Sequence, residues 1–135
     1  MRPILLLLGL ILAGAATAAD PLIGTRWKLV DIPGRNLAQV PKQKHPTLRF
    51  DGVRAKGRGV CNVLTATYTL LEPDRMSFGR VGGDMLPCRE GQQLEEFYIE
   101  QIQDVQHYAI DGDALELTTR TGKRLRFARQ ADKDD

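Results

Sequence analysis

VRAKGRGVCNVLTATYTLL, residues 53–71, is the most informative segment of the chain because it contains two consecutive strand-like runs. In residues 53–60, small residues that would let another backbone or a ring approach closely alternate with three cations, Arg54, Lys56 and Arg58. Successive side chains of a strand point to opposite faces, so these cations must share one face, turned towards water or a partner. In residues 65–71, alanine, tyrosine and leucine alternate with threonines, a composition that favours a strand.

Shorter strand-like runs lie on both sides of this segment. Period-two alternation and turn residues predict further strands at residues 26–32, 47–50, 76–78, 108–110, 114–119 and 123–128. Apolar residues at helical spacing predict one amphipathic helix from residue 92 to about residue 106. Residues 33–46 show no clear period and are expected to form a loop. The pattern therefore predicts a mostly β domain with a single helix.

The N-terminus has the organisation of a cleavable secretory signal peptide, residues 1–18. Arg2 supplies the positive region, residues 4–12 are almost entirely aliphatic, and Ala16-Thr17-Ala18 fits the pattern that signal peptidase recognises. The aliphatic run is far shorter than the roughly 20 residues of a membrane-spanning helix. Ala15 occupies the place of the cysteine that a lipoprotein would acylate. We therefore expect cleavage near Ala18 or Ala19, a mature chain that is neither lipidated nor membrane-spanning, and a periplasmic or secreted location.

The mature chain has the length of one domain, which we expect over residues 19–129, followed by a flexible charged tail at 130–135. Loss of Arg2 lowers the net charge from +2 to +1, without the strong basic excess that is typical of a nucleic-acid binder. Residues 21–60 contain nine basic and two acidic side chains, whereas residues 61–118 contain three basic and eleven acidic ones.

This uneven distribution of charge has two interpretations. In the first, the basic and acidic halves neutralise each other in the fold, and the cations of residues 53–60 pair with the acidic helix. In the second, the basic half forms a surface for an acidic or lipidic partner, with Arg54, Lys56 and Arg58 as candidate binding residues.

The sequence offers no recognisable catalytic or metal-binding motif. Ser77, the only serine, lies outside any nucleophile elbow. His45 and His107 are isolated and lack metal-ligand spacing. The glycines of residues 79–83 lack the lysine and hydroxyl residue that end a phosphate loop. We therefore predict no catalytic residues, no metal and no cofactor.

Cys61 and Cys88 are the only cysteines in the chain. In an oxidising compartment such a pair indicates a disulfide, which would add about 3–4 kcal/mol of stability in the chain-entropy model. The alternative is a catalytic cysteine beside His45 or His107, which requires a reduced thiolate and an adjacent base. The two interpretations differ in whether the native protein contains a free thiol.

These motifs together resemble the META domain, the HslJ-like family of small bacterial envelope proteins, over residues 22–127. Residues 24–29, GTRWKL, are similar to the G-T-x-W-x-L opening strand of that family. Residues 57–62, GRGVCN, followed by Tyr68-Thr69-Leu70, resemble its G-x-G-G-C-N…Y-x-L core, with Val60 in place of a glycine. Met85 and Cys88 are similar to a Met-x-Cys segment but are one residue further apart, and the Met-Glu-x-Glu run before the helix is missing.

The resemblance implies an α+β fold: a single small domain with a curled antiparallel β-sheet, forming a partly open barrel, and one packed amphipathic helix. It implies a core position for Trp27, turn geometry for Gly59 and Asn62, a structural role for Tyr68, and disulfide bonding for Cys61. It implies no reaction, because the family is linked to heat stress, envelope resilience and secretion without an established catalytic activity.

We therefore expect a non-enzymatic, stress-related envelope protein that binds a protein or a lipid-like ligand. This binding function requires a concave apolar surface inside the curled sheet. The alternative is a secreted inhibitor of a hydrolase, a lysozyme or a protease, which would insert residues 35–44 into a cleft as an exposed, ordered loop.

Export can be tested by intact-mass analysis of the protein purified from the periplasm. The order of charged, aliphatic and small residues predicts that the first 18 or 19 residues are removed. A soluble product that retains residues 1–18 would contradict this prediction.

Overall fold

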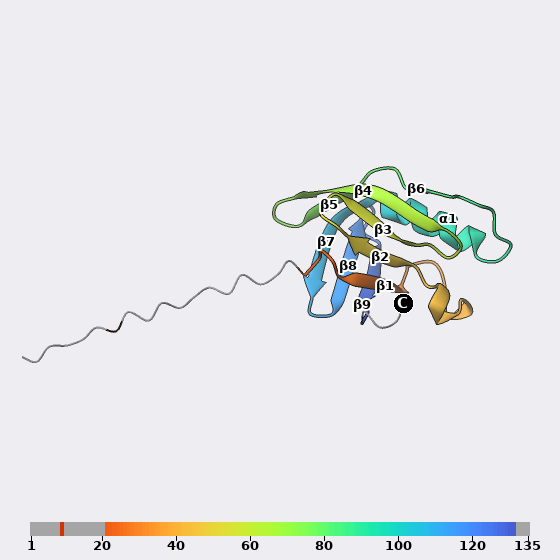
Figure 1. Ribbon diagram of the computed structural model, residues 1–135, viewed down its shortest axis with the longest axis horizontal. Helices are drawn as coiled ribbons and strands as arrows, with labels where there is room; N and C mark the ends of the chain where they lie inside the picture. The colour runs from red at the N-terminus through yellow and green to blue at the C-terminus, as the bar shows by residue number, and fades with distance from the viewer. Residues whose placement is uncertain (1–8, 10–20, 132–135) are drawn as a thin grey trace, which may run out of the picture.

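The computed structural model of the chain, drawn in Figure 1, describes residue 9 and residues 21–131. The signal peptide and cleavage site expected from the sequence, and residues 132–135 of the expected tail, lie outside the described residues. Within the described ranges, no helix is long and apolar enough to cross a membrane.

The described residues form nine β-strands, one α-helix and two short 3₁₀ helices, η1 and η2 (Figure 1). In chain order they are β1 (Arg26–Asp31), η1 (Leu37–Gln39), η2 (Lys42–Lys44), β2 (Thr47–Phe50), β3 (Arg54–Arg58), β4 (Val63–Leu71), β5 (Arg75–Phe78), β6 (Gly82–Gly83), α1 (Gln92–Gln103), β7 (Val105–Asp111), β8 (Ala114–Thr119) and β9 (Arg124–Arg129).

Eight of these strands close into an antiparallel barrel. Their order is β3-β2-β1-β9-β8-β7-β5-β4, and β4 pairs back with β3. The two-residue β6 only adds to the side of β4. The expected partly open barrel is therefore wrong, because β3 and β4 stay in register from Arg54 opposite Thr67 to Arg58 opposite Val63. This pairing removes the free strand edges that an open sheet would expose.

Gly57 allows β3 to approach β2 closely. A Cβ atom at this position would collide with the main-chain carbonyl of Thr47. Glycine inside a strand commonly marks such a close approach of two backbones. The small-residue face of β3 thus helps to close the barrel, with Ala55 and Gly59 buried, although Val53 is exposed.

The barrel interior is filled by side chains of alternating strand positions. Trp27, Leu29, Phe50 and Phe127 are fully buried. The indole N–H of Trp27 donates to the carbonyl of Leu22 at 3.4 Å. Burying aromatic side chains of this size contributes a large part of a core's stability.

Tyr68 joins this core to the loop before β3. Its ring packs edge-on against Phe50, with 4.9 Å between the ring centroids. Its hydroxyl accepts a hydrogen bond of 2.8 Å from the backbone N–H of Gly52. The polar end of a mostly buried side chain is therefore satisfied.

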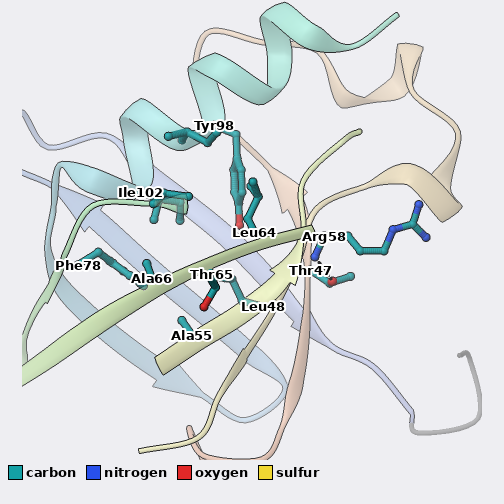
Figure 2. A pocket seen from close by; sticks show the side chains of 12 residues that line it. Thr47, Leu48, Ala55, Arg58, Leu64, Thr65, Ala66, Phe78, Tyr98 and Ile102 are labelled. Atoms are coloured by element: carbon teal, nitrogen blue, oxygen red, sulfur yellow. Dashed lines mark hydrogen bonds between the residues drawn. The ribbon is translucent and has the colours of Figure 1, made fainter. Parts of the chain in front are cut away.

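Helix α1 buries Leu94, Tyr98 and Ile102, and Figure 2 shows Tyr98 and Ile102 extending from the helix towards the strands. It ends at Gln103, about three residues earlier than the sequence pattern predicted. Val105 instead begins β7, where it is buried opposite Thr119. An apolar residue at this spacing fits both a helical stripe and an inward strand position, so periodicity alone could not separate the two.

Glu95 is the one buried carboxylate in the described part of the chain. Its Oε1 accepts hydrogen bonds from the backbone N–H groups of Cys61 (3.0 Å) and Asn62 (2.9 Å). Its Oε2 accepts one from Asn62 Nδ2 (2.7 Å). Gly59 lies against the same carboxylate, which a Cβ atom there would strike. Glu95 therefore joins α1 to the turn between β3 and β4.

Asn62 extends this network to the loop between β6 and α1. Its Nδ2 also donates to the carbonyl of Leu86 (3.0 Å), and its Oδ1 accepts from the N–H of Leu86 (3.1 Å). Both amide protons and the amide oxygen are thus used. The predicted disulfide between Cys61 and Cys88 is confirmed, with 6.2 Å between the Cα atoms, and links the same turn to the same loop.

Substitution of Glu95 tests how much this hydrogen-bond network contributes to the stability of the fold. In Glu95→Gln an amide N–H₂ must face at least one donor, so we expect a loss of about 2–4 kcal/mol in the free energy of unfolding. Denaturant unfolding measures it, with Glu96→Gln as control, because Glu96 is exposed on the same helix. Equal, small effects of the two substitutions would contradict the assigned role of Glu95.

The disulfide has a separate test. Alkylation of the native protein should label no thiol before reduction, and the double variant Cys61→Ser/Cys88→Ser should be about 3 kcal/mol less stable. Labelling of both cysteines in the native protein would show that the bond does not form and would revive the free-thiol alternative.

Candidate anion-binding groove

Two adjoining hollows lie on the outer surface of the barrel, over β1, β2 and β3. The first has a volume of about 290 Å³ and the second about 430 Å³, and both are lined by Arg26, Thr47 and Arg58. We call them together the basic groove, because their lining contains six cations: Arg26, Lys28, Lys42, Arg49, Lys56 and Arg58. No acidic side chain of the described residues lines either hollow.

Strand alternation and register bring these cations together. Trp27 and Leu48 point inward, so their neighbours in the chain point outward. In the antiparallel register Arg26 lies opposite Arg49, and Arg49 lies opposite Lys56, which gives a row of three cations across three strands. Positions paired across neighbouring strands lie close together, so the register places these three side chains side by side on the outer face of the barrel.

Hydrogen bonds of Thr47 and His45 hold the backbone around the second hollow in place. The hydroxyl of Thr47 accepts a 3.1 Å hydrogen bond from the backbone N–H of Arg58. Figure 2 shows the Arg58 side chain pointing away from the barrel interior. His45 Nε2 lies 3.1 Å and 2.9 Å from the carbonyl oxygens of Leu37 and Val40, so it must carry the proton and donate. These bonds hold the loop that places Lys42 beside the groove.

The structure separates the three cations that the sequence singled out. Arg54, Lys56 and Arg58 are all exposed, but only Lys56 and Arg58 line the basic groove. Arg54 begins β3 opposite Thr67, and its backbone N–H donates to the Asp51 carboxylate at 2.6 Å. This bond and that from Val53 lower the pKa of Asp51.

The basic groove does not fit the first interpretation, in which the basic and acidic halves of the sequence neutralise each other. Among the described residues the ion pairs join Asp104, Asp113 and Glu116 to arginines of residues 120–129, and Asp74 to His107. Within the same residues, none of them involves Lys28, Lys42, Lys56 or Arg58. The acidic half is thus partly neutralised from the C-terminal strands, and these four cations keep their charge at the surface.

The sequence pattern did not indicate that Arg26, Lys28, Lys42 and Arg49 lie in one groove with Lys56 and Arg58. The signal was present in residues 26–29 and 47–50, where cations alternate with core residues. Their convergence depends on which strands are neighbours, and a single strand does not contain that information.

The groove suits anion binding by its chemistry. Guanidinium and ammonium groups are strong donors to phosphate and carboxylate oxygens. Among the described residues the lining of the two hollows includes no serine, cysteine or carboxylate, and Nε2 of its one histidine, His45, is already bonded to backbone carbonyls. In the described part of the chain, no three His, Cys, Asp or Glu side chains are grouped to hold a metal ion.

Within the described residues, the barrel interior is filled by core side chains. A cavity of about 20 Å³ lies beneath α1, lined mainly by apolar side chains (Figure 2). The Tyr98 hydroxyl and Thr65 Oγ1 are buried there without a hydrogen-bond partner, and burial raises the pKa of Tyr98. Such a volume holds about one water molecule. The concave apolar surface expected for a lipid-like ligand is therefore absent from this interior.

Residues 35–44 lie against the domain. The guanidinium of Arg35 is 4.1 Å from the ring centroid of Phe97 on α1. Leu37 is buried, and its carbonyl is bonded to His45. Residues 35, 36, 38, 39 and 41–44 are nevertheless exposed, so these contacts order the loop without burying it, and the inhibitor alternative stays a prediction.

Comparison with known proteins identifies relatives by sequence and by fold. The family model described as META domain matches residues 20–132, most of the chain. An NMR structure of a protein from Burkholderia xenovorans is similar with a TM-score of 0.68 and 25% identity, over 86% of this chain and 94% of that chain. A crystal structure of a DUF4847 family protein from Bacteroides vulgatus shares the fold, with a TM-score of 0.61 and 15% identity over 82% of this chain and 97% of that one. No curated protein matches the chain. The span of the family match shows that the chain belongs to the META domain family.

Proposed function

We propose that this protein is a non-enzymatic binding module of the bacterial envelope that holds an anionic partner in the basic groove. The observation that carries the proposal is the convergence of Lys28, Lys42, Lys56 and Arg58 from β1, η2 and β3, with no ion pair and no acidic side chain in the lining among the described residues. A concentration of one charge sign in a concave site attracts ligands of the opposite sign.

Two features support a periplasmic location within this proposal. The N-terminal sequence has the organisation of a signal peptide. The Cys61–Cys88 disulfide fits an oxidising compartment, in which such bonds persist. A role in envelope stress, which the family resemblance implies, is part of the same proposal.

A titration with inorganic pyrophosphate tests the groove directly. We expect chemical-shift changes in ¹⁵N spectra to be confined to the residues that line the groove, and binding to weaken as salt is raised. Lys56→Glu/Arg58→Glu should weaken binding by about tenfold or more, since it removes two charge-assisted contacts. The melting temperature should change little, because exposed charges contribute little to stability.

Arg54→Glu is the matched control, because Arg54 is exposed on the same strand but lies outside the groove. It should leave pyrophosphate binding nearly unchanged. Equal losses in Arg54→Glu and in the double variant, or shifts spread over the whole barrel, would show that the groove is not a specific anion site.

A further inference from the structure

Three exposed apolar side chains gather at one end of the barrel, next to the basic groove. Val63, Met85 and Leu86 are 59%, 51% and 65% exposed. The Asn62 side chain binds the backbone of Leu86 through two hydrogen bonds, and Val63 directly follows Asn62. Gly83 packs so closely on Val63 that a Cβ atom there would collide with the Val63 carbonyl. We call these three side chains the apolar tip.

Hydrogen bonds and the disulfide tie the backbone beside the apolar tip to the rest of the domain. Leu86 is fixed by Asn62, Asn62 is fixed by the buried Glu95, and the disulfide closes the same loop at Cys88. Met85 has a φ of 50°, the one positive φ of a non-glycine residue in the described part of the chain. Unfavourable backbone geometry is retained where the surroundings enforce it, often at binding sites. A loop ordered in advance loses less entropy on binding.

The apolar tip and the basic groove share one residue, Val63. Val63 belongs to both, because it lines the first hollow together with Lys56 and Arg58. In the β3–β4 register Val63 lies directly opposite Arg58. A partner that contacts the cations is therefore also within reach of the apolar side chains.

This combination matches the surface of an anionic lipid bilayer. Cations attract the lipid phosphates, and aliphatic side chains gain free energy by entering the boundary of the acyl chains. Since the barrel interior has no space for an acyl chain, contact with lipid must occur on the outside.

We propose that the anionic partner is the phosphate-bearing surface of a phospholipid membrane, bound by the basic groove while Met85, Leu86 and Val63 insert at the edge of the acyl region. The inference rests on the proposed function and adds the class of partner. It gives the protein a reversible means of attachment to a membrane.

Co-sedimentation with vesicles tests the inference on the mature protein. We expect binding to vesicles of phosphatidylglycerol, much weaker binding to vesicles of phosphatidylcholine, and release by salt. Met85→Ser/Leu86→Ser should reduce binding to phosphatidylglycerol vesicles about tenfold or more, yet leave the pyrophosphate shifts in the groove unchanged. Leu71→Ser is the control, because Leu71 is 60% exposed and lies at the opposite end of β4 from Val63.

The remaining outcomes separate the two proposals. If pyrophosphate binds in the groove but phosphatidylglycerol vesicles do not, the membrane inference is wrong, and the groove serves a free anion or an acidic protein. Vesicle binding that does not depend on Met85 and Leu86 also overturns it. If neither probe binds, the proposed function itself fails. Thermal melting of each variant shows that a loss of binding is not a loss of fold.

Discussion

The carboxylate of Glu95 connects three separate parts of the chain. These are helix α1, the turn between β3 and β4 and, through Asn62, the loop between β6 and α1. The carboxylate accepts hydrogen bonds from the turn that joins β3 to β4, and Asn62 passes the connection on to Leu86. A buried carboxylate is stable only when donors surround it, and here two backbone N–H groups and one amide supply them. Gly59 leaves the space that the carboxylate needs. The helix, the β3–β4 pairing that closes the barrel, and the apolar tip all meet at this contact.

Closure of the barrel decides where ligands can bind. Once β4 pairs with β3, the interior is packed by Trp27, Phe50 and Phe127, and the remaining cavity has room for little more than a water molecule. Recognition must then use the outer surface. On β1, β2 and β3 the outward positions carry cations in adjacent cross-strand places. The same alternation that builds the core thus builds the groove.

Local pattern predicted the strands and the helix well, because alternation and helical spacing are properties of short segments. It also predicted the pairing of Cys61 with Cys88, since the chain has no other cysteine. The role of Glu95 could not be found in this way. Glu95 and Glu96 are equivalent as acidic residues near a helix start, and the donors to Glu95 lie 33 and 34 residues earlier. Barrel closure and the convergence of Arg26, Arg49 and Lys56 likewise depend on which strands become neighbours.

The ion pairs show which of the unequally distributed charges of the sequence are neutralised in the folded protein. The arginines of residues 120–129 form ion pairs with Asp104, Asp113 and Glu116, so these three carboxylates already have cationic partners in the C-terminal part of the chain. Lys28, Lys42, Lys56 and Arg58 have no such partner among the described residues, although they lie close together. Such a cluster raises the electrostatic energy of the folded chain unless ions or a ligand offset it. Because the exposed apolar side chain of Val63 borders this cluster, the proposed partner is one that presents negative charge beside an apolar region.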